Sequence, residues 1–227
     1  MRVLAIDTSL GGCSACVLQR GGNVAIARET MLIEKGHAEE LIPLLDRVMA
    51  RVDGGFKSLD RVAVTVGPGS FTGMRVGLSA ARAAGVALGI PVIGVSTLSA
   101  YLAPMMREEA GRVVVAAIDA RHKHIYIQAL VHGGRALIGP KIAPVREIVR
   151  ELGSAAITLS GSGAPVLAAE LWSVGLDVRI QDASPSPDIM WVARLGLASD
   201  PAHSPANPMY LKAPDAQPQN NGRLMRQ

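Results

Sequence analysis

Two short segments of the chain carry residue types that can hold phosphate. Asp7, Thr8 and Ser9 follow directly on the apolar run 3–6. A carboxylate at a strand end can hold a magnesium-bound water, and the hydroxyls and amides of a turn can bind phosphate. The second segment, residues 67–73 (GPGSFTG), precedes a long apolar stretch, so its amides can meet an anion at a helix start. The candidate nucleotide-binding residues are therefore Asp7, Thr8, Ser9, Gly67 and Gly69.

Other features of the same segments argue against ATP turnover. Segment 67–73 has neither the Gly-Lys-Ser/Thr of a P-loop nor the dinucleotide fingerprint. A matching apolar run in the second half also ends on an aspartate, but Asp119 is followed by Ala120 and Arg121, whose side chain would crowd a phosphate. The alternative role for Asp7 and Asp119 is to cap their turns by accepting backbone N–H bonds.

The sequence contains no recognisable nucleophile or metal-ligand set. Cys13 and Cys16 form a C-x-x-C, but the predicted strand around them holds the two thiols on opposite faces, so we expect two separate buried thiols. His122 and His124 share a face at a strand start, but neither belongs to a His-x-x-x-His or His-Glu-x-x-His pair. No Gly-x-Ser-x-Gly elbow occurs. We therefore expect neither a catalytic residue nor a bound metal.

The elements that must position these residues follow an α/β pattern that occurs twice. In each half three predicted strands precede a helix, a strand and a further helix or turn, which indicates a duplicated β-β-β-α-β-α unit with an abbreviated second copy. The first copy is predicted as strands 3–6, 13–19, 24–30, 62–66 and 91–95 with helices 37–51 and 73–89. The second copy is predicted as strands 113–119, 124–131, 135–138 and 156–159 with helix 145–152. We expect lobes at 1–103 and 104–212 and a disordered tail at 213–227.

Helix 73–89 is apolar on nearly every side, so it must be covered on more than one face. Arg75 and Arg82 are seven residues apart, share one face and could border a contact. Burial within this chain alone is the alternative, but we favour a partner interface made by helices 38–50 and 73–89. The predicted interface residues are His37, Leu41, Leu44, Leu45, Val48, Met74, Arg75, Leu78, Ala81 and Arg82.

Composition limits the possible partners and compartments. The 227 residues carry a formal charge of +4, spread evenly along the chain, and only 3% are aromatic. Such a chain lacks the basic stripe and the many rings typical of nucleic-acid binding. It also has no apolar run of about 18 residues, and its N-terminal apolar run is too short for a signal peptide. We expect a cytoplasmic protein without membrane contact.

A duplicated unit that opens on a strand followed by Asp-Thr resembles the actin-like ATPase superfamily, in which two units face each other across a nucleotide cleft. Five segments in order are similar to the TsaB (YeaZ) family of tRNA threonylcarbamoyladenosine biosynthesis proteins. They are 1–9 (MRVLAIDTS), 67–77 (GPGSFTGMRVG), 94–98 (GVSTL), 117–121 (AIDAR) and 208–212 (PMYLK). The resemblance covers residues 1–212. Lys212 replaces the usual Arg, and His124 stands where a carboxylate is common.

The resemblance implies a non-catalytic subunit that pairs with a TsaD-like enzyme to form threonylcarbamoyladenosine beside the tRNA anticodon. It implies a TsaE-like ATPase as a further partner, a homodimer in isolation, and tRNA contact through the complex. ATP and metal would belong to partner subunits, since the His-x-x-x-His pair of TsaD corresponds here to Thr97 and Tyr101. The alternative is an independent enzyme, either an actin-like ATPase or a glycoprotease-type metallopeptidase.

Overall fold

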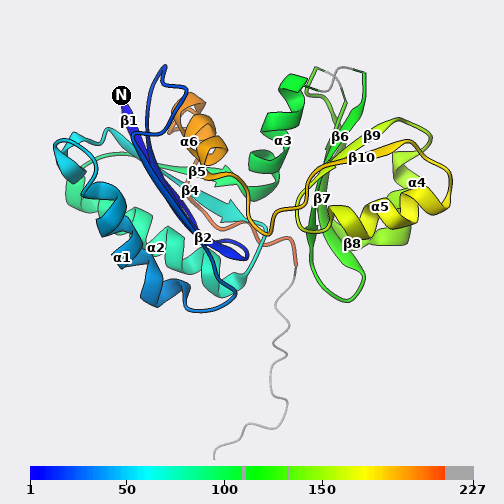
Figure 1. Ribbon diagram of the computed structural model, residues 1–227, viewed down its shortest axis with the longest axis horizontal. Helices are drawn as coiled ribbons and strands as arrows, with labels where there is room; N and C mark the ends of the chain where they lie inside the picture. Colours follow the sequence, from blue (N-terminus) through cyan, green and yellow to red (C-terminus); the bar gives the residue numbers. More distant parts are fainter. Residues whose placement is uncertain (109–110, 132, 213–227) are drawn as a thin grey trace, which may run out of the picture.

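The computed structural model describes residues 1–108, 111–131 and 133–212. The chain forms two lobes, each built on a five-stranded mixed sheet, and Figure 1 shows the two sheets side by side with helices around them. This architecture is α/β, as the alternation of short apolar runs and helical patterns predicts.

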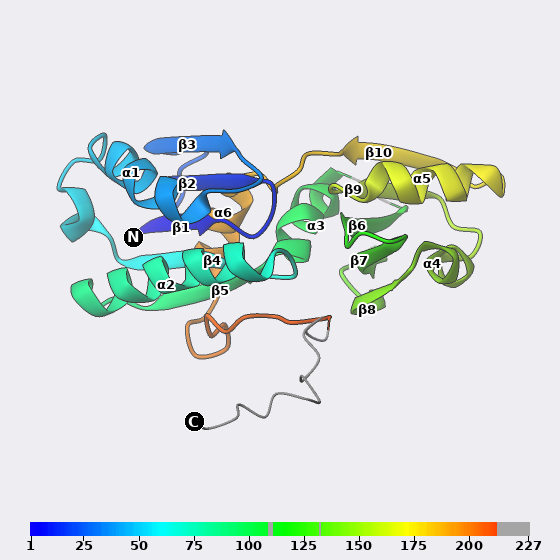
Figure 2. The ribbon, with the colours of Figure 1, turned by 90° about the horizontal axis from the view of Figure 1, so that it is seen from below.

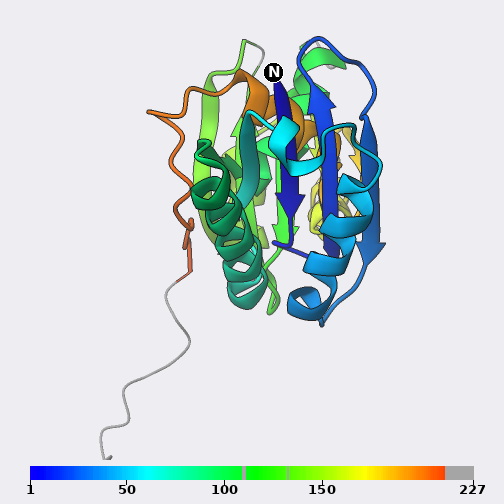
Figure 3. The same cartoon turned by 90° about the vertical axis from the view of Figure 1, so that its left-hand side faces the viewer.

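The first lobe has the strand order β3-β2-β1-β4-β5. Helices α1 and α2 cover one face of this sheet, where they pack side by side (Figure 3), and helix α6 covers the other face. Its strands are β1 (Arg2–Asp7), β2 (Gly12–Gln19), β3 (Ala27–Leu32), β4 (Arg61–Gly67) and β5 (Val92–Ser96). Its helices are α1 (His37–Met49), the 3₁₀ turn η1 (Gly55–Ser58), α2 (Phe71–Leu88), α3 (Thr97–Glu108) and α6 (Ile189–Ala198).

The second lobe repeats this topology in the order β8-β7-β6-β9-β10. Helices α4 and α5 pack on one face of its sheet, and α3 packs on the other face, so that α3 joins the two lobes. Its elements are β6 (Val113–Asp119), β7 (His124–Leu130), β8 (Ala136–Pro144), α4 (Val145–Leu152), β9 (Ile157–Ser160), α5 (Ala164–Ser173) and β10 (Val178–Asp182). The abbreviation lies in the helices, because α4 and α5 have 8 and 10 residues where α1 and α2 have 13 and 18.

The expected lobe boundaries need one correction, because the chain returns to the first lobe after β10. Helix α6 packs on β1, β2 and β4, with Val192 and Ala193 buried against the first sheet. The expected second lobe, residues 104–212, therefore ends too late. The apolar pattern of α6 shows that this helix is buried, but sequence alone does not say against which sheet. The expected disordered tail, 213–227, lies outside the described residues.

Residues 200–212 form an extended segment, which we call the strap, along the edge of the first sheet (Figure 2). Pro205 forms a bridge with Ile93, and the Gly94 amide donates to the Ser204 carbonyl at 2.9 Å. Farther along, the Met209 amide donates to the Val66 carbonyl at 2.7 Å. The strap thus covers β5, the edge strand, whose free backbone groups would otherwise be open to pairing with another chain.

Several element boundaries differ from the sequence prediction, and the largest difference is in β8, which continues to Pro144 where the predicted strand ended at 138. The third strand begins at Ala27 rather than at residue 24, and Val24 is 80% exposed in the preceding turn. Helix α2 begins at Phe71 rather than at 73, because the Ser70 hydroxyl caps it by accepting from the Gly73 amide at 3.3 Å. The cysteine prediction is confirmed, since Cys13 and Cys16 are free, buried and packed on opposite faces of the first sheet.

Candidate functional site

The turn after β1 holds a closed cluster of polar side chains rather than an open phosphate loop. One Asp7 oxygen, Oδ1, accepts from the Ser9 amide at 3.0 Å, the Ser9 hydroxyl at 2.6 Å and the Thr65 hydroxyl at 2.6 Å. The other oxygen, Oδ2, is buried without a hydrogen-bond partner among the described residues. Burial raises the pKa of Asp7, against the lowering effect of these hydrogen bonds.

Glycines of the following loop and helix close this turn from outside. A Cβ at Gly69 would lie 2.1 Å from the Ser9 carbonyl oxygen, and a Cβ at Gly73 would lie 2.1 Å from that of Thr8. The Ser70 amide also donates to the Ser9 carbonyl, and the Thr8 hydroxyl donates to the Gly73 carbonyl, both at 2.7 Å. The space that a phosphate needs next to the turn is therefore filled by the protein's own backbone.

This packing argues against the predicted nucleotide-binding role of Asp7, Thr8, Ser9 and Gly67, whereas Gly69 also lines the cavity between the lobes and its role stays a prediction. The first three residues are completely buried, and the two glycines let the backbone of 67–73 approach the turn and the strap instead of a ligand. A magnesium–nucleotide group does not fit here. The alternative capping role is confirmed for both aspartates, because Asp119 likewise accepts from the Arg121 amide at 2.8 Å.

Thr97 and Tyr101, the positions that the resemblance implies stand in place of a metal pair, are buried and carry ordinary structural hydrogen bonds. The Thr97 hydroxyl donates to the Ser9 hydroxyl at 3.2 Å, and the Tyr101 hydroxyl donates to the Ser184 carbonyl at 2.9 Å. Burial raises the pKa of Tyr101, which keeps the phenol neutral. Within the described ranges, no three His, Cys, Asp or Glu side chains are grouped so that they could hold a metal ion.

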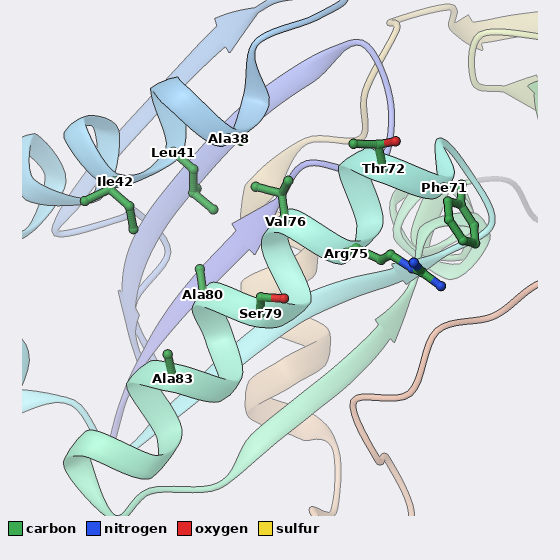
Figure 4. Close-up of a pocket in the computed structure, with 10 residues that line it drawn as sticks. All are labelled: Ala38, Leu41, Ile42, Phe71, Thr72, Arg75, Val76, Ser79, Ala80 and Ala83. Carbon is green, nitrogen blue, oxygen red and sulfur yellow. The ribbon is translucent and has the colours of Figure 1, made fainter. Parts of the chain in front are cut away.

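A groove of about 610 Å³ runs between α1 and α2 on the outer face of the first lobe. Figure 4 shows Leu41 and Ile42 on α1 opposite the side chains of α2. The groove is mostly apolar, and Ile42 and Phe71 are 55% and 50% exposed. Its lining residues are Ala38, Leu41, Ile42, Phe71, Thr72, Arg75, Val76, Ser79, Ala80 and Ala83. We call it the α1–α2 groove.

Most side chains predicted for the partner interface lie in the protein's own core, so that part of the prediction is wrong. The buried ones are His37, Leu41, Leu44, Leu45, Val48, Met74, Leu78 and Ala81. The reason is that a repeat at i, i+4 and i+7 marks the helix face that packs on the helix's own sheet. Sequence reasoning missed the outward positions between them, chiefly Ile42, Phe71, Ser79 and Ala83.

The two arginines of the prediction are exposed, but they contact the strap. The Arg82 guanidinium donates to the Ala206 carbonyl at 2.6 Å and to the Asn207 side-chain oxygen at 3.2 Å. Arg75 lies 3.8 Å over the Phe71 ring and donates from Nε to the Tyr210 hydroxyl at 3.3 Å. Their shared face therefore serves first to fix residues 206–210 to α2.

A second cavity, of about 830 Å³, lies between the lobes, and we call it the interlobe cleft. The first lobe lines it with the loop before α2 and with residues around Lys35, and the strap contributes Tyr210. The second lobe contributes Asp119, Arg121, Tyr126 and Ser162. At its edge the rings of Phe71 and Tyr210 lie 5.4 Å apart at 32°. Sequence reasoning did not single out Tyr210 or Lys35.

Two smaller points concern the exposed histidines and the helices. His122 and His124 are exposed on the turn after β6, where His124 Nδ1 lies 2.9 Å from the His122 carbonyl oxygen. None of the described helices combines the length and the apolar character that a membrane span requires.

Comparison with known proteins identifies the family. A family model described as TsaD, tRNA N6-adenosine threonylcarbamoyltransferase, matches residues 31–180. An uncharacterized protein of Mycobacterium tuberculosis is 35% identical over 216 residues, which are 95% of this chain and 94% of the relative. The Escherichia coli tRNA threonylcarbamoyladenosine biosynthesis protein TsaB is 34% identical over 128 residues, so the match spans 56% of this chain and about half (53%) of that relative.

Solved structures agree with this assignment. YeaZ from Pseudomonas aeruginosa is 25% identical, with a TM-score of 0.72 over 92% of this chain and 99% of its own. The ethanolamine utilization protein EutJ from Carboxydothermus hydrogenoformans, 14% identical with a TM-score of 0.50 over 87% of this chain and 89% of its own, shares the actin-like fold. The duplicated topology and these relatives together show that the chain belongs to the TsaB (YeaZ) family.

Proposed function

We propose that this protein is a non-catalytic subunit in the formation of threonylcarbamoyladenosine on tRNA. In this proposal it works in the cytoplasm and binds a TsaD-like enzyme through the α1–α2 groove, with a TsaE-like ATPase as a further partner of the complex. The observation that carries the proposal is the exposed apolar surface that α1 and α2 leave after they have packed on their own sheet.

The shape of this surface suits another pair of helices. Small side chains at Ser79, Ala80 and Ala83 leave room for close approach, and Ile42 and Phe71 flank them as larger apolar groups. Exposed apolar patches of a few hundred Å² or more usually mark protein interfaces. Without the partner, the same surface can pair with a second copy of the chain in an isologous homodimer.

The alternative is an independent ATPase or metallopeptidase, and the buried clusters argue against both. The turn that would hold phosphate is filled by the backbone around Gly69 and Gly73. At the positions of the TsaD metal ligands stand Thr97 and a neutral Tyr101, neither of which is a good ligand for a catalytic metal. In our proposal the chain therefore carries no cofactor, and ATP and metal belong to its partners.

The test is calorimetric binding to the TsaD-like protein of the same cell, together with tRNA modification in cells that carry each variant. Ala83→Glu places a carboxylate in the groove, and desolvating it should cost several kcal/mol, so affinity should fall by about 100-fold or more. Val166→Glu on α5 is the matched control, because Val166 is similarly exposed but lies in the second lobe. Unchanged affinity in a folded Ala83→Glu protein would overturn the proposed interface, and ATP or peptide turnover by the isolated chain would overturn the non-catalytic role.

A further inference from the structure

The edge of the interlobe cleft combines exposed rings with unpaired cations. Phe71 and Tyr210 are 50% and 46% exposed and lie at ring-stacking distance, although few aromatic residues occur in the chain. Arg75 completes this group by lying over Phe71 and bonding to the Tyr210 hydroxyl. Phe71 and Tyr210 therefore form an aromatic surface on a cavity large enough for a ligand, and Arg75 holds the two rings from the side of the α1–α2 groove.

Two cations face the same cavity. Lys35 and Arg121 both line the cleft, one from each lobe, and neither has an ion-pair partner within 4.0 Å among the described residues. The acidic side chains of the cleft are Glu34 and Asp119, and Asp119 is already used by the amide of its own turn. Lys212 also lines the cleft, so three cations stand against these two carboxylates and the lining has a formal charge of +1.

The turn that carries Arg121 has a backbone conformation that residues other than glycine rarely adopt. Arg121, His122 and Lys123 have φ angles of 65°, 52° and 61°, which places three consecutive non-glycine residues in the left-handed region. Two backbone hydrogen bonds hold this shape. The Ala120 amide donates to the His124 carbonyl, and the Val145 amide donates to the Lys123 carbonyl. All three side chains are exposed, and Arg121 lines the cleft, so the strained turn fixes this cation at the cleft with Lys123 two positions farther along the chain.

We propose that the edge of the interlobe cleft binds single-stranded RNA. An unpaired base stacks on the exposed face of the Phe71–Tyr210 pair, and the adjacent phosphates contact Lys35, Arg121 and Lys123. A positively charged groove with aromatic rings is the combination by which proteins hold single strands. This inference adds direct RNA contact to the proposed function, on which it rests for the choice of RNA over other polyanions. Phe71 and Arg75 also line the α1–α2 groove, so Tyr210, which lines only the cleft, is the ring that stays available when a partner occupies that groove.

The experiment measures fluorescence anisotropy of a labelled single-stranded RNA of roughly nine nucleotides with the isolated full-length chain. Tyr210→Ala should weaken binding about tenfold, as expected for the loss of one base–ring stack, and Tyr210→Phe should restore it. Lys35→Ala with Arg121→Ala should also weaken binding. The double variant should flatten the logarithmic salt dependence by about 0.7 for each phosphate that no longer meets a cation. Trp172→Ala and Arg146→Ala, exposed side chains of the second lobe outside the cleft, should leave binding unchanged.

Three other outcomes of these measurements would contradict the proposal. Equal weakening by the control variants would show non-specific charge attraction, and equally tight binding of a duplex of the same sequence would exclude single-strand recognition. Displacement of the RNA by ATP alone at comparable concentration would assign the cleft to a free nucleotide instead. Because the RNA assay uses the isolated chain, its failure leaves the calorimetric test of partner binding independent.

Discussion

Gly73→Ala tests how tightly the protein's own backbone closes the turn after β1. Gly73 lies in the first turn of an 18-residue helix, where replacing glycine by alanine normally stabilises by about 1 kcal/mol. Here the new Cβ would lie 2.1 Å from the Thr8 carbonyl oxygen, roughly 1.3 Å inside the 3.4 Å at which ordinary contact begins. Helix α2 must then move away from the turn and strain the hydrogen bond from the Thr8 hydroxyl to the Gly73 carbonyl.

The net effect should be a loss of stability. Overpacking of this kind costs about 3 kcal/mol when the obstacle is backbone, which leaves a net loss of about 2 kcal/mol after the gain in helix propensity. In a chain of this size, that corresponds to a fall in Tm of roughly 4–8 °C. Calorimetric melting of wild type and variant, together with urea unfolding, measures both quantities.

Gly139→Ala is the matched control, because a Cβ at Gly139 in strand β8 would meet nothing within 4 Å. Its effect should stay within about 0.5 kcal/mol. If Gly73→Ala instead raises Tm, as helix propensity alone requires, then the turn has room beside it. The argument that no phosphate fits next to Asp7 would then be refuted together with the packing.

Three further predictions concern single side chains. Because burial raises the folded-state pKa of Asp7 above its ordinary 3.8, wild type should lose stability relative to Asp7→Asn as the pH rises above 3.8; a pH-independent difference in urea unfolding would contradict this. Burial raises the pKa of Cys13 to about 11 and of Cys16 to about 12, so neither thiol should react with iodoacetamide at neutral pH until the protein unfolds, and labelling of the native protein would contradict their burial. Arg82→Ala removes the bonds to Ala206 and Asn207, so hydrogen exchange at Gly94, which bonds to the strap, should become several-fold faster with little change in Tm; unchanged exchange would show that the strap is held without Arg82.

Local features were predictable because they depend on local physics. The run from Val3 to Ile6 and the buried thiols of Cys13 and Cys16 each follow from residue types within a few positions, and the duplicated unit follows from the repetition of the same pattern. The choice of interface side chains failed because one pattern is compatible with two roles. Leu41 and Leu45 repeat as they would on a partner-binding helix, but the first layer they must cover is their own sheet.

The contacts that sequence could not predict join residues far apart in the chain. Arg75 and Tyr210 are separated by 135 positions and meet only because α6 carries the chain back to the first lobe. Likewise, the neighbouring residues alone suggest that a glycine at 69 or 73 marks a flexible loop or a weak helix start. Only the approach of the turn at Thr8 and Ser9 shows that each of these glycines is a point of backbone contact.

The two lobes place the same turn in opposite environments, and this asymmetry limits what the cleft can hold. Asp7 and Asp119 occupy equivalent strand ends and cap their turns in the same way. The first turn is completely buried beneath α2, whereas the second is exposed and carries Arg121 and Lys123. A triphosphate clamped between two open turns is therefore excluded by the packing of the first. A ligand anchored on the second turn, with a base resting on Tyr210 of the strap, avoids that packing, which is the reason for proposing a strand of RNA rather than a nucleotide held between the lobes.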